Sequence, residues 1–197
     1  MPTNPFSTRY TEPGAVAYLF PQNVTASGIV ECFITLGKRC QIVAPHGSGK
    51  STLIQTLLPL LREHFDSVSL QTLHDNQRHL DKTFWREIKR GNNLAIIDGY
   101  EQLSFCEKQK VNFYTKSLLI TLHKPIRNLP ILSSDTITIE RFKMLLTQLC
   151  NKPKQPPLPE KLNQLIENET ELSKLLTKHK NNCREVFFEL YDIAEGE

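Results

Sequence analysis

The sequence predicts a three-layer α/β fold built around a parallel β-sheet. Short apolar runs typical of buried strands alternate with segments whose apolar residues recur at helical spacing. From about residue 135 onward the pattern is helical throughout. We therefore expect an N-terminal extended arm over residues 1–24, an α/β core over 25–134 and a small C-terminal helical lid over 135–197.

The composition excludes a disordered chain and a membrane protein, since 39% of the 197 residues are apolar and 23% are charged. No apolar run reaches the length of a bilayer span, and residues 1–10 lack the basic and apolar segments of a secretory signal. Five cysteines without a CxxC pair favour reduced thiols, so we expect a cytoplasmic protein. The net charge of +3, with scattered basic residues, does not indicate nucleic-acid binding.

The arm over residues 1–24 is rich in Pro, Thr and Asn and is expected to be extended. Its aromatic residues are expected to hold it against the rest of the protein: Phe6, Tyr10, Tyr18 and Phe20. Thr25 can cap the helix that follows, and Gly37 can end it. The apolar face of this helix is expected to comprise Ile29, Phe33 and Leu36.

The core is expected to contain β-strands wherever a short apolar or alternating run occurs: 40–44, 67–73, 93–99 and 116–124. The run 129–134 predicts either a further strand or a loop. Between strands, residues 53–61 have the spacing of a helix, and Pro59 is predicted to kink this helix or end its regular part. A second helix over 80–91 is expected to close at Gly91.

Three or four short helices are expected in the lid, and a stiff proline-rich linker over 151–160 interrupts them. Their apolar faces are expected to comprise Phe142, Leu146 and Leu149, then Leu162, Leu165 and Ile166, then Leu172, Leu175 and Leu176, and finally Val186, Leu190 and Ile193.

The loop between the first strand and its helix, APHGSGKS over residues 44–51, has the chemistry of a phosphate site. Glycines let successive backbone N–H groups turn inward around an anion, and the helix N-terminus adds its positive dipole end. Lys50 could then reach the β- and γ-phosphates, and the Ser51 hydroxyl could bind Mg²⁺. The alternative is a Gly-Ser turn followed by a basic helix start.

This loop resembles the Walker A motif GxxxxGK[ST], with Ala44 in place of the first glycine. The position lies at the strand exit, where a methyl group can be tolerated. The resemblance assigns nucleotide binding to Pro45, His46, Gly47, Ser48, Gly49, Lys50, Ser51 and Thr52.

A second motif, LAIIDGYEQL, resembles a Walker B strand that ends at Asp98. The resemblance implies that Asp98 holds Mg²⁺ through water together with Ser51. The alternative is a plain buried strand that ends in an Asp-Gly turn. Many relatives place a catalytic Glu directly after the Asp, where this chain has Gly99, so Glu101 is the candidate base. This D-G-Y-E-Q stretch resembles a shortened DGxDE arrangement of NACHT and related signalling ATPases, although Glu101 could equally be a structural or partner-contacting residue.

Two further resemblances concern residues that sense the γ-phosphate. In P-loop ATPases of the additional-strand class the strand after Walker B ends in such a residue, and Thr121 and His123 occupy one face there. The stretch NNCREVFFEL resembles the start of the last lid helix of AAA+ ATPases, which makes Arg184 the sensor 2 candidate, with Asn181 in place of the usual glycine. The alternatives are a polar strand cap for His123 and an ordinary salt-bridged arginine for Arg184.

The N-terminal segment of AAA+ proteins often lines the adenine pocket. This resemblance implies that Tyr18 or Phe20 stacks on the base and that Pro5 and Phe6 wall the pocket. The alternative, an arm pinned to the core by its aromatic residues, remains open. Arg127 is the one nearby candidate for an arginine finger.

Taken together, residues 41–192 resemble a minimal AAA+ or STAND-like P-loop ATPase of the additional-strand (ASCE) division. The resemblance implies a five-stranded parallel sheet in order 5-1-4-3-2, ATP with Mg²⁺, and in some members ring assembly. ABC and RecA-like ATPases fit poorly, because the short interval between Lys50 and Asp98 leaves no room for an ABC helical insertion and no DNA-binding loop is evident.

We therefore expect an ATP-binding protein that is a weak Mg²⁺-dependent ATPase and acts as a nucleotide-controlled switch. It would bind ATP and ADP and act on an unidentified protein partner or through self-assembly. Two alternatives stay open. One is a P-loop small-molecule kinase, with Arg141 and Arg184 as parts of its lid. The other is a non-hydrolysing module that recruits a partner when ATP binds.

Overall fold

The computed structural model describes residues 4–88, 92–150 and 159–196, and these fall into two compact units. The helical unit comprises the residues up to 19, the loop 45–52 and the residues from 136 onward. The sheet unit comprises 20–44 and 53–135. The predicted linker over 151–160 lies almost wholly outside the described residues, as does the predicted helix end at Gly91.

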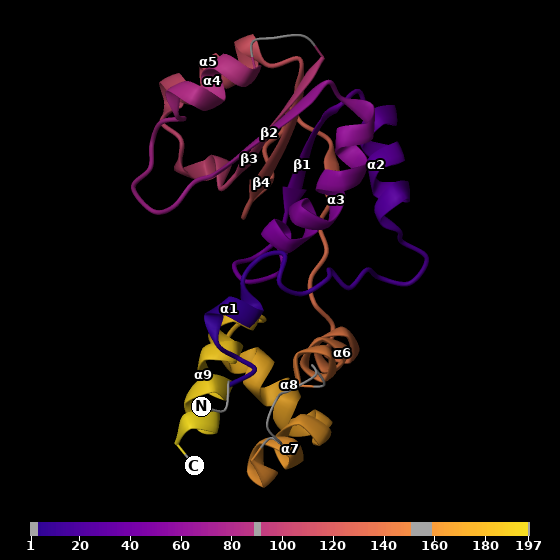
Figure 1. The fold of residues 1–197 in the computed structure, drawn as a ribbon, viewed down its shortest axis with the longest axis vertical. Coiled ribbons are helices and arrows are strands. Elements are labelled where there is room, and N and C mark those ends of the chain that lie inside the picture. The colour runs from indigo at the N-terminus through magenta and orange to yellow at the C-terminus, as the bar shows by residue number, and fades with distance from the viewer. Residues whose placement is uncertain (1–3, 89–91, 151–158, 197) are drawn as a thin grey trace. The chain divides into compact units, whose positions relative to one another are not determined.

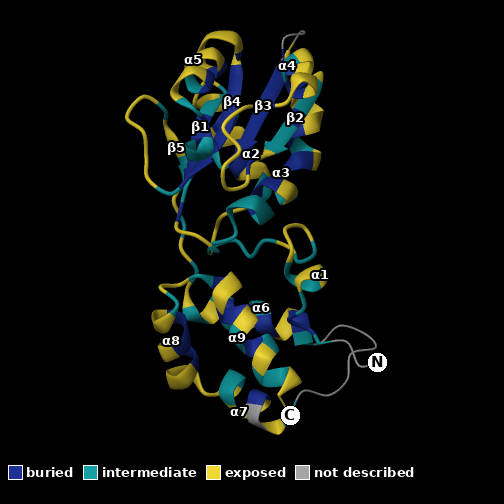
Figure 2. Cartoon of the chain, turned by 90° about the vertical axis from the view of Figure 1, so that its left-hand side faces the viewer, coloured by how far each residue is buried: buried dark blue, intermediate teal, exposed yellow. Residues whose placement is uncertain are grey.

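The sheet unit contains a five-stranded parallel sheet in the order β2-β3-β4-β1-β5 (Figure 1). Its strands are β1 (Arg39–Val43), β2 (Ser67–Thr72), β3 (Asn93–Asp98), β4 (Ser117–Leu122) and β5 (Ile131–Ser133). This confirms the predicted order 5-1-4-3-2, and the run left open between strand and loop is a strand, β5. Every residue of β3 and β4 is buried, as expected for central parallel strands (Figure 2).

Helices cover both faces of this sheet and make three layers. Helices α2 (Ala26–Thr35) and α3 (Lys50–His64) lie on one side, and α4 (Lys82–Ile88) and α5 (Phe105–Tyr114) on the other (Figure 1). Thr25 caps α2 as predicted, since its side chain accepts a hydrogen bond from the Gly28 N–H. The prediction that Leu36 belongs to the apolar face of this helix was wrong. The helix ends before Leu36, and 40% of this residue is exposed.

Among the described residues, the α-helices α1 and α5 have no counterpart in the sequence-based prediction. Helix α5 buries only Glu107 and Val111, so it lacks the apolar periodicity that marks a helix. The four-residue helix α1 (Thr8–Thr11) lies within the arm that was expected to be extended. In α3, the helix neither stops nor loses its regular part at Pro59, and it continues to His64.

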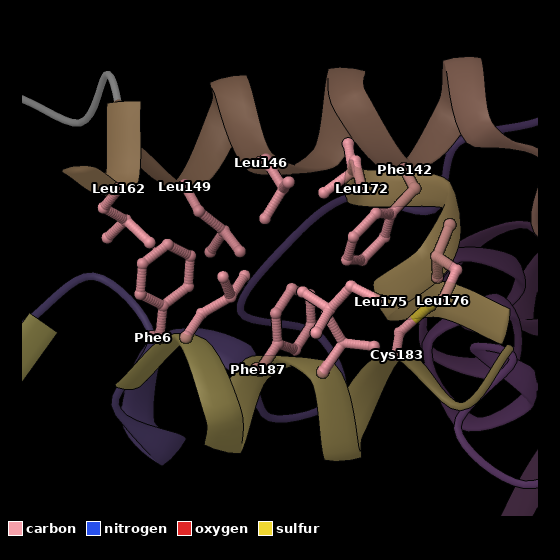
Figure 3. Close-up of a cluster of buried hydrophobic side chains, with 12 residues drawn as sticks. Phe6, Phe142, Leu146, Leu149, Leu162, Leu172, Leu175, Leu176, Cys183 and Phe187 are labelled. Atoms are coloured by element: carbon pink, nitrogen blue, oxygen red, sulfur yellow. The ribbon is translucent and has the colours of Figure 1, made fainter. Parts of the chain in front are cut away.

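The helical unit has a core of its own, built by α6 (Ile139–Cys150), α7 (Glu160–Glu167), α8 (Glu169–Lys178) and α9 (Cys183–Glu195). Figure 3 shows leucines of α6, α7 and α8 gathered in one cluster with Phe6, Phe142 and Phe187. The predicted apolar faces are confirmed: the buried members are Phe142, Leu146, Leu149, Leu162, Leu172, Leu175, Leu176, Val186 and Leu190, and the partly buried ones are Leu165, Ile166 and Ile193.

The N-terminal arm belongs to this helical core. Phe6 is 1% exposed and its ring centroid lies 6.4 Å from that of Phe187 (Figure 3). Asn4 Nδ2 donates to the Tyr191 backbone oxygen and to Glu195 Oε1, each at 3.1 Å. Burying one phenylalanine stabilises a fold by about 1.5–3 kcal/mol. Phe6 therefore fixes the arm to α9, within the helical unit and not against the α/β core.

A buried carboxylate ties α4 and α5 together on one face of the sheet. The Glu107 side chain is 5% exposed and lies 2.9 Å from Lys110 Nζ. Its Oε2 also accepts hydrogen bonds from the Leu80 N–H at 3.4 Å and from Trp85 Nε1 at 3.3 Å. Burial raises the pKa of Glu107, but the bonds from Lys110, Leu80 and Trp85 outweigh it and leave this pKa below its ordinary value of 4.5.

We expect the Glu107→Gln variant to be less stable by about 1–3 kcal/mol, the usual cost of disturbing a buried charged hydrogen-bond group. Because the folded-state pKa of Glu107 is depressed, its ionised form stabilises the fold above the ordinary carboxyl pKa. That stability is lost as the pH falls through the folded value. Urea unfolding at neutral pH and near pH 4 measures both effects.

The control for this prediction is Glu63→Gln, which removes an exposed carboxylate from α3. The difference between wild type and Glu107→Gln should shrink at the lower pH, whereas Glu63→Gln should match wild type at both. A Glu107→Gln penalty that does not change with pH would contradict the role given to the charge.

No helix among the described residues combines the length and the apolar character needed to cross a membrane.

Candidate functional site

The predicted phosphate loop joins β1 to α3 without any other element between them. The chain leaves β1 at Val43, and α3 begins at Lys50. Ala44 is 6% exposed and extends the sheet by donating its N–H to the Leu122 carbonyl at 3.1 Å. It is not among the described residues with positive φ, so the methyl group in place of glycine causes no backbone strain.

Two glycines give the loop its curvature. Gly47 has a φ of +66° and Gly49 a φ of +88°, in the left-handed region that side chains disfavour. Left-handed residues that alternate with others turn successive backbone N–H groups toward one side, which makes a concave anion site. Lys50 Nζ donates to the Pro45 carbonyl at 2.8 Å, so the ammonium group lies over the loop. Ser48 Oγ donates to the same oxygen at 2.8 Å.

Within the helical unit, this loop packs against the start of α9 and against the arm. A Cβ atom built on Gly47 would lie 1.8 Å from Asn182 Oδ1 and 3.1 Å from Asn182 Cα. A Cβ on Gly49 would lie 3.4 Å from Cε2 of Tyr18. Tyr18, one of the two arm residues predicted to stack on a nucleotide base, therefore lies beside the glycine that would contact its phosphates.

The turn before α9 combines a left-handed backbone conformation with a side chain that caps the helix. Asn181 has a φ of 61°, so it adopts the left-handed conformation for which glycine is usually used. Asn182 then caps α9, with Oδ1 accepting from the backbone N–H groups of Arg184 and Glu185. The Arg184 side chain is exposed, and among the described residues no carboxylate forms an ion pair with it.

Sequence analysis did not identify Asn182. An Asn before an apolar helical run is a recognisable N-cap signal, so the cap could have been found. The contact with Gly47 depends on tertiary packing and carries no signal in the sequence.

In the sheet unit, Asp98 and Thr121 form a buried pair at the carboxyl ends of β3 and β4. Ile97 pairs with Ile120 in the register of these strands, which places the next two residues side by side. Thr121 Oγ1 donates to Asp98 Oδ1 at 2.6 Å and accepts from the Gly99 N–H at 2.8 Å. The Thr121 hydroxyl proton is thus directed at Asp98, where it orients the carboxylate.

Glu101 and His123 form a second pair at the same edge of the sheet. Glu101 lies in η1 (Tyr100–Gln102), the 3-10 turn after β3, and His123 directly follows β4. Glu101 Oε1 is 2.7 Å from His123 Nδ1. The sequence offered each residue singly for a catalytic or sensing role, and the adjacency of β3 and β4 brings the two together.

Gly99 explains why the carboxylate is displaced from the position next to Asp98. Its φ is +87°, and a Cβ there would lie 2.9 Å from the Leu73 carbonyl oxygen. A side chain at this position would meet backbone, so the first residue after Asp98 that can carry a carboxylate toward this edge lies beyond the glycine turn.

The remaining candidates lie as follows. His46 is exposed, Ser51 and Thr52 belong to the first turn of α3, and Phe20 is half-buried. Arg141 binds the arm, since its Nη1 donates to the Leu19 carbonyl at 3.3 Å. Its Nη2 donates to the Thr136 carbonyl, shortly before α6, at 2.6 Å. Arg127 is exposed between β4 and β5. Among the described residues, no three His, Cys, Asp or Glu side chains are grouped so as to hold a metal ion.

The sheet order, with the glycine loop between β1 and α3, is that of a P-loop NTPase. This chain has that fold. No protein-family profile matches the sequence, and no curated protein matches it.

Solved structures similar to this chain include the Thermotoga maritima RuvB Holliday junction branch migration motor. It is 12% identical, with a TM-score of 0.41 over 86% of this chain and 70% of the other. A mutant of the same RuvB is 10% identical, with a TM-score of 0.43 and the same coverage. Similarity at this level says nothing about what the chain binds.

Proposed function

We propose that this chain binds ATP with Mg²⁺, hydrolyses it slowly, and uses the bound nucleotide to control its helical unit. The observation that carries the proposal is the loop geometry. The left-handed Gly47 and Gly49 lie around Ser48, and the Lys50 ammonium lies over the same loop. Cβ atoms added at these glycines would fill or crowd the loop, and a cation lies above it. A concave backbone site of this kind suits a chain of phosphates.

The residues available for a metal ion fit Mg²⁺. Mg²⁺ prefers oxygen ligands and is usually held by one or two carboxylates together with substrate phosphates. In the proposal the Ser51 hydroxyl binds the ion directly, and Asp98 holds it through water. Bound Mg²⁺ neutralises charge on the phosphates. Thr121 keeps the Asp98 carboxylate in one orientation through its 2.6 Å hydrogen bond.

The contact between Gly47 and Asn182 supports the role as a switch. A ligand shifts a conformational equilibrium only if it interacts differently with the two states. Here the N-cap of α9, Asn182, touches the loop that would carry the phosphates, and Arg184 follows two residues later. Phosphate in the loop therefore has a direct route to the helix that carries the sensor candidate, and a protein partner or a second copy of the chain could read the change.

The test of the proposal is a titration with a fluorescent ATP analogue, with and without Mg²⁺, followed by phosphate release from ATP. We expect saturable binding that Mg²⁺ strengthens, together with slow phosphate release. Protection of α9 against hydrogen exchange should be greater with ATP than with ADP. The absence of saturable binding would refute the proposal.

Asp98→Asn should reduce the effect of Mg²⁺ on ATP binding by about 10- to 100-fold, the usual cost of removing an outer-shell metal partner. The asparagine can still accept from Thr121, so the fold should survive and binding without Mg²⁺ should change little. Magnesium titrations of the ATP-analogue affinity measure this. Asp192→Asn, which removes an exposed carboxylate from α9, is the control and should leave the Mg²⁺ dependence as in wild type.

A further inference from the structure

Helix α5 presents an exposed, uncharged row of side chains that we call the α5 ridge: Phe105, Gln109 and Phe113. Phe105 is 74% exposed, Phe113 is 82% exposed, and Gln109 between them is exposed as well (Figure 2). Residues four apart follow one ridge along a helix, so the row is about 12 Å long. The buried residues of α5, Glu107 and Val111, lie on the opposite side of the helix.

The lysines of α5 are engaged within the sheet unit. Lys108 Nζ donates to the Glu101 backbone oxygen at 3.1 Å and lies 5.6 Å from the centroid of the Tyr100 ring. Lys110 Nζ lies 2.9 Å from Glu107 Oε1. An anionic partner would need cations that face it, whereas these two already bind groups of their own chain. The α5 ridge therefore suits an uncharged, apolar surface.

A row of aromatic rings supports the Phe113 end of the ridge. The ring centroids of Phe113 and Tyr114 lie 5.0 Å apart, and those of Tyr114 and Trp85 lie 6.2 Å apart, both edge-on. Trp85 on α4 donates in turn to Glu107 Oε2 at 3.3 Å. The most exposed ring of the row is thus held outward by less exposed ones. Exposed apolar surface of this kind marks an interaction site.

We propose that the α5 ridge binds the same ridge of a second copy of this chain, with the two helices antiparallel about a two-fold axis at Gln109. Phe105 and Phe113 lie four residues to either side of Gln109, so Phe105 of each copy contacts Phe113 of the other. A two-fold interface requires this reciprocal pairing. Antiparallel helices also place the positive end of each helix dipole beside the negative end of the other. The inference goes beyond the proposed function and does not rest on it.

The area of the ridge fits a weak, reversible dimer. A buried aromatic side chain covers about 150–250 Å², so the four phenylalanines at their present exposures would remove roughly 500–800 Å² from water. Stable interfaces bury about 1,200–2,000 Å², and weaker encounters bury less. The exposed Cys106 and the 49% exposed Tyr114 lie beside the ridge and add to its area.

Sedimentation of the full chain tests the proposal. Between about 10 and 500 μM we expect a reversible monomer–dimer equilibrium, the same with and without MgATP. Phe105→Ser and Phe113→Ser should each weaken the dimer by at least about tenfold, because both rings lie at the centre of the contact. Phe188→Ser, which removes a 44% exposed phenylalanine from α9, is the matched control and should dimerise as wild type does. A wild type that stays monomeric throughout, or association unaffected by both ridge variants, would overturn the proposal.

Charge exchange at Gln109 tests the antiparallel arrangement. Gln109 faces its own symmetry mate at the axis, so Gln109→Lys and Gln109→Glu should each weaken the dimer by at least about tenfold through like-charge repulsion. An equimolar mixture of the two variants should associate again, because opposite charges then meet. A partner other than a second copy would not produce this recovery. A mixture that associates no better than its components would overturn the proposal.

Cysteine alkylation provides a readout at the ridge itself. Cys106 follows Phe105 and is exposed, as is Cys32 on α2. The alkylation rate of Cys106 should fall as the protein concentration rises, whereas that of Cys32 should stay constant. A Cys106 rate independent of concentration would overturn the proposal. Dimerisation without saturable ATP binding would refute the proposed function alone, and MgATP binding by a chain that stays monomeric would refute the dimer alone.

Discussion

Replacement of Lys50 by alanine is expected to abolish ATP binding while the chain remains folded. Lys50 is the cation of the loop, and its ammonium group donates to the carbonyl of Pro45 in the same loop. The triphosphate carries several negative charges, and a positioned lysine is the main group that neutralises them. We expect the affinity for a fluorescent ATP analogue to fall by at least about 100-fold, which corresponds to about 2.8 kcal/mol.

The matched control is Lys174→Ala, which removes the same charge from an exposed position on α8, paired only with Glu171 at 2.8 Å among the described residues. This variant should bind the analogue as wild type does. Circular dichroism and thermal unfolding of both variants should resemble those of wild type, because Lys50 is not among the buried residues and its ammonium group binds a carbonyl of the loop. Unchanged binding by Lys50→Ala would remove the loop from the nucleotide site.

Gly47→Ala is expected to lower stability and to prevent nucleotide binding. A side chain at position 47 lowers the free energy of unfolding for two reasons. The φ of +66° disfavours any L-residue, which costs about 1–2 kcal/mol. The added carbon would also lie 1.8 Å from Asn182 Oδ1, so the loop and the start of α9 must move apart. Crowding of this kind typically costs a further 1–3 kcal/mol or so, and it displaces the loop that would hold phosphate.

Gly37→Ala measures the cost of a positive φ without the cost of crowding. Gly37 has a φ of +88°, but a Cβ there would have no atom within 4 Å. Urea unfolding should therefore show a small loss for Gly37→Ala and a larger one for Gly47→Ala, with ATP binding lost only in the latter. Adding Asn182→Gly should restore part of the stability of Gly47→Ala, because glycine costs only a few tenths of a kcal/mol at an N-cap. Equal losses for the two glycine variants would show that the Asn182 contact has no effect.

Most of the sheet could be read from the sequence because buried parallel strands are short, apolar and separated by helices. β3 and β4 are buried along their whole length, and their runs stand out from the flanking residues. Helix α5 could not be found in this way. Phe105 is 74% exposed and Phe113 is 82% exposed, so its phenylalanines face outward, and its buried face carries Val111 and a carboxylate. Tertiary burial of Glu107 overrides the local pattern.

For the site, sequence analysis supplied the residues but not their grouping. The Walker-like motifs identified Lys50 and Asp98 because loop geometry and strand ends leave a local signature. The pairing of Glu101 with His123 depends on β3 and β4 being neighbours. The contact of Asn182 with Gly47 depends on the fold of the helical unit. Packing between segments distant in the sequence determines both, and local composition cannot report it.

The place of Phe6 and Asn4 on α9 bears on how this protein can be trimmed for the laboratory. A fragment that starts shortly before the first strand would look sensible, since it keeps the sheet and both nucleotide motifs. It would nevertheless leave a cavity the size of a phenylalanine side chain among the C-terminal helices, and the apolar side chains around that cavity would be exposed to water. Shortened versions of the protein should therefore keep the N-terminal residues. Without them we expect aggregation that is unrelated to nucleotide binding.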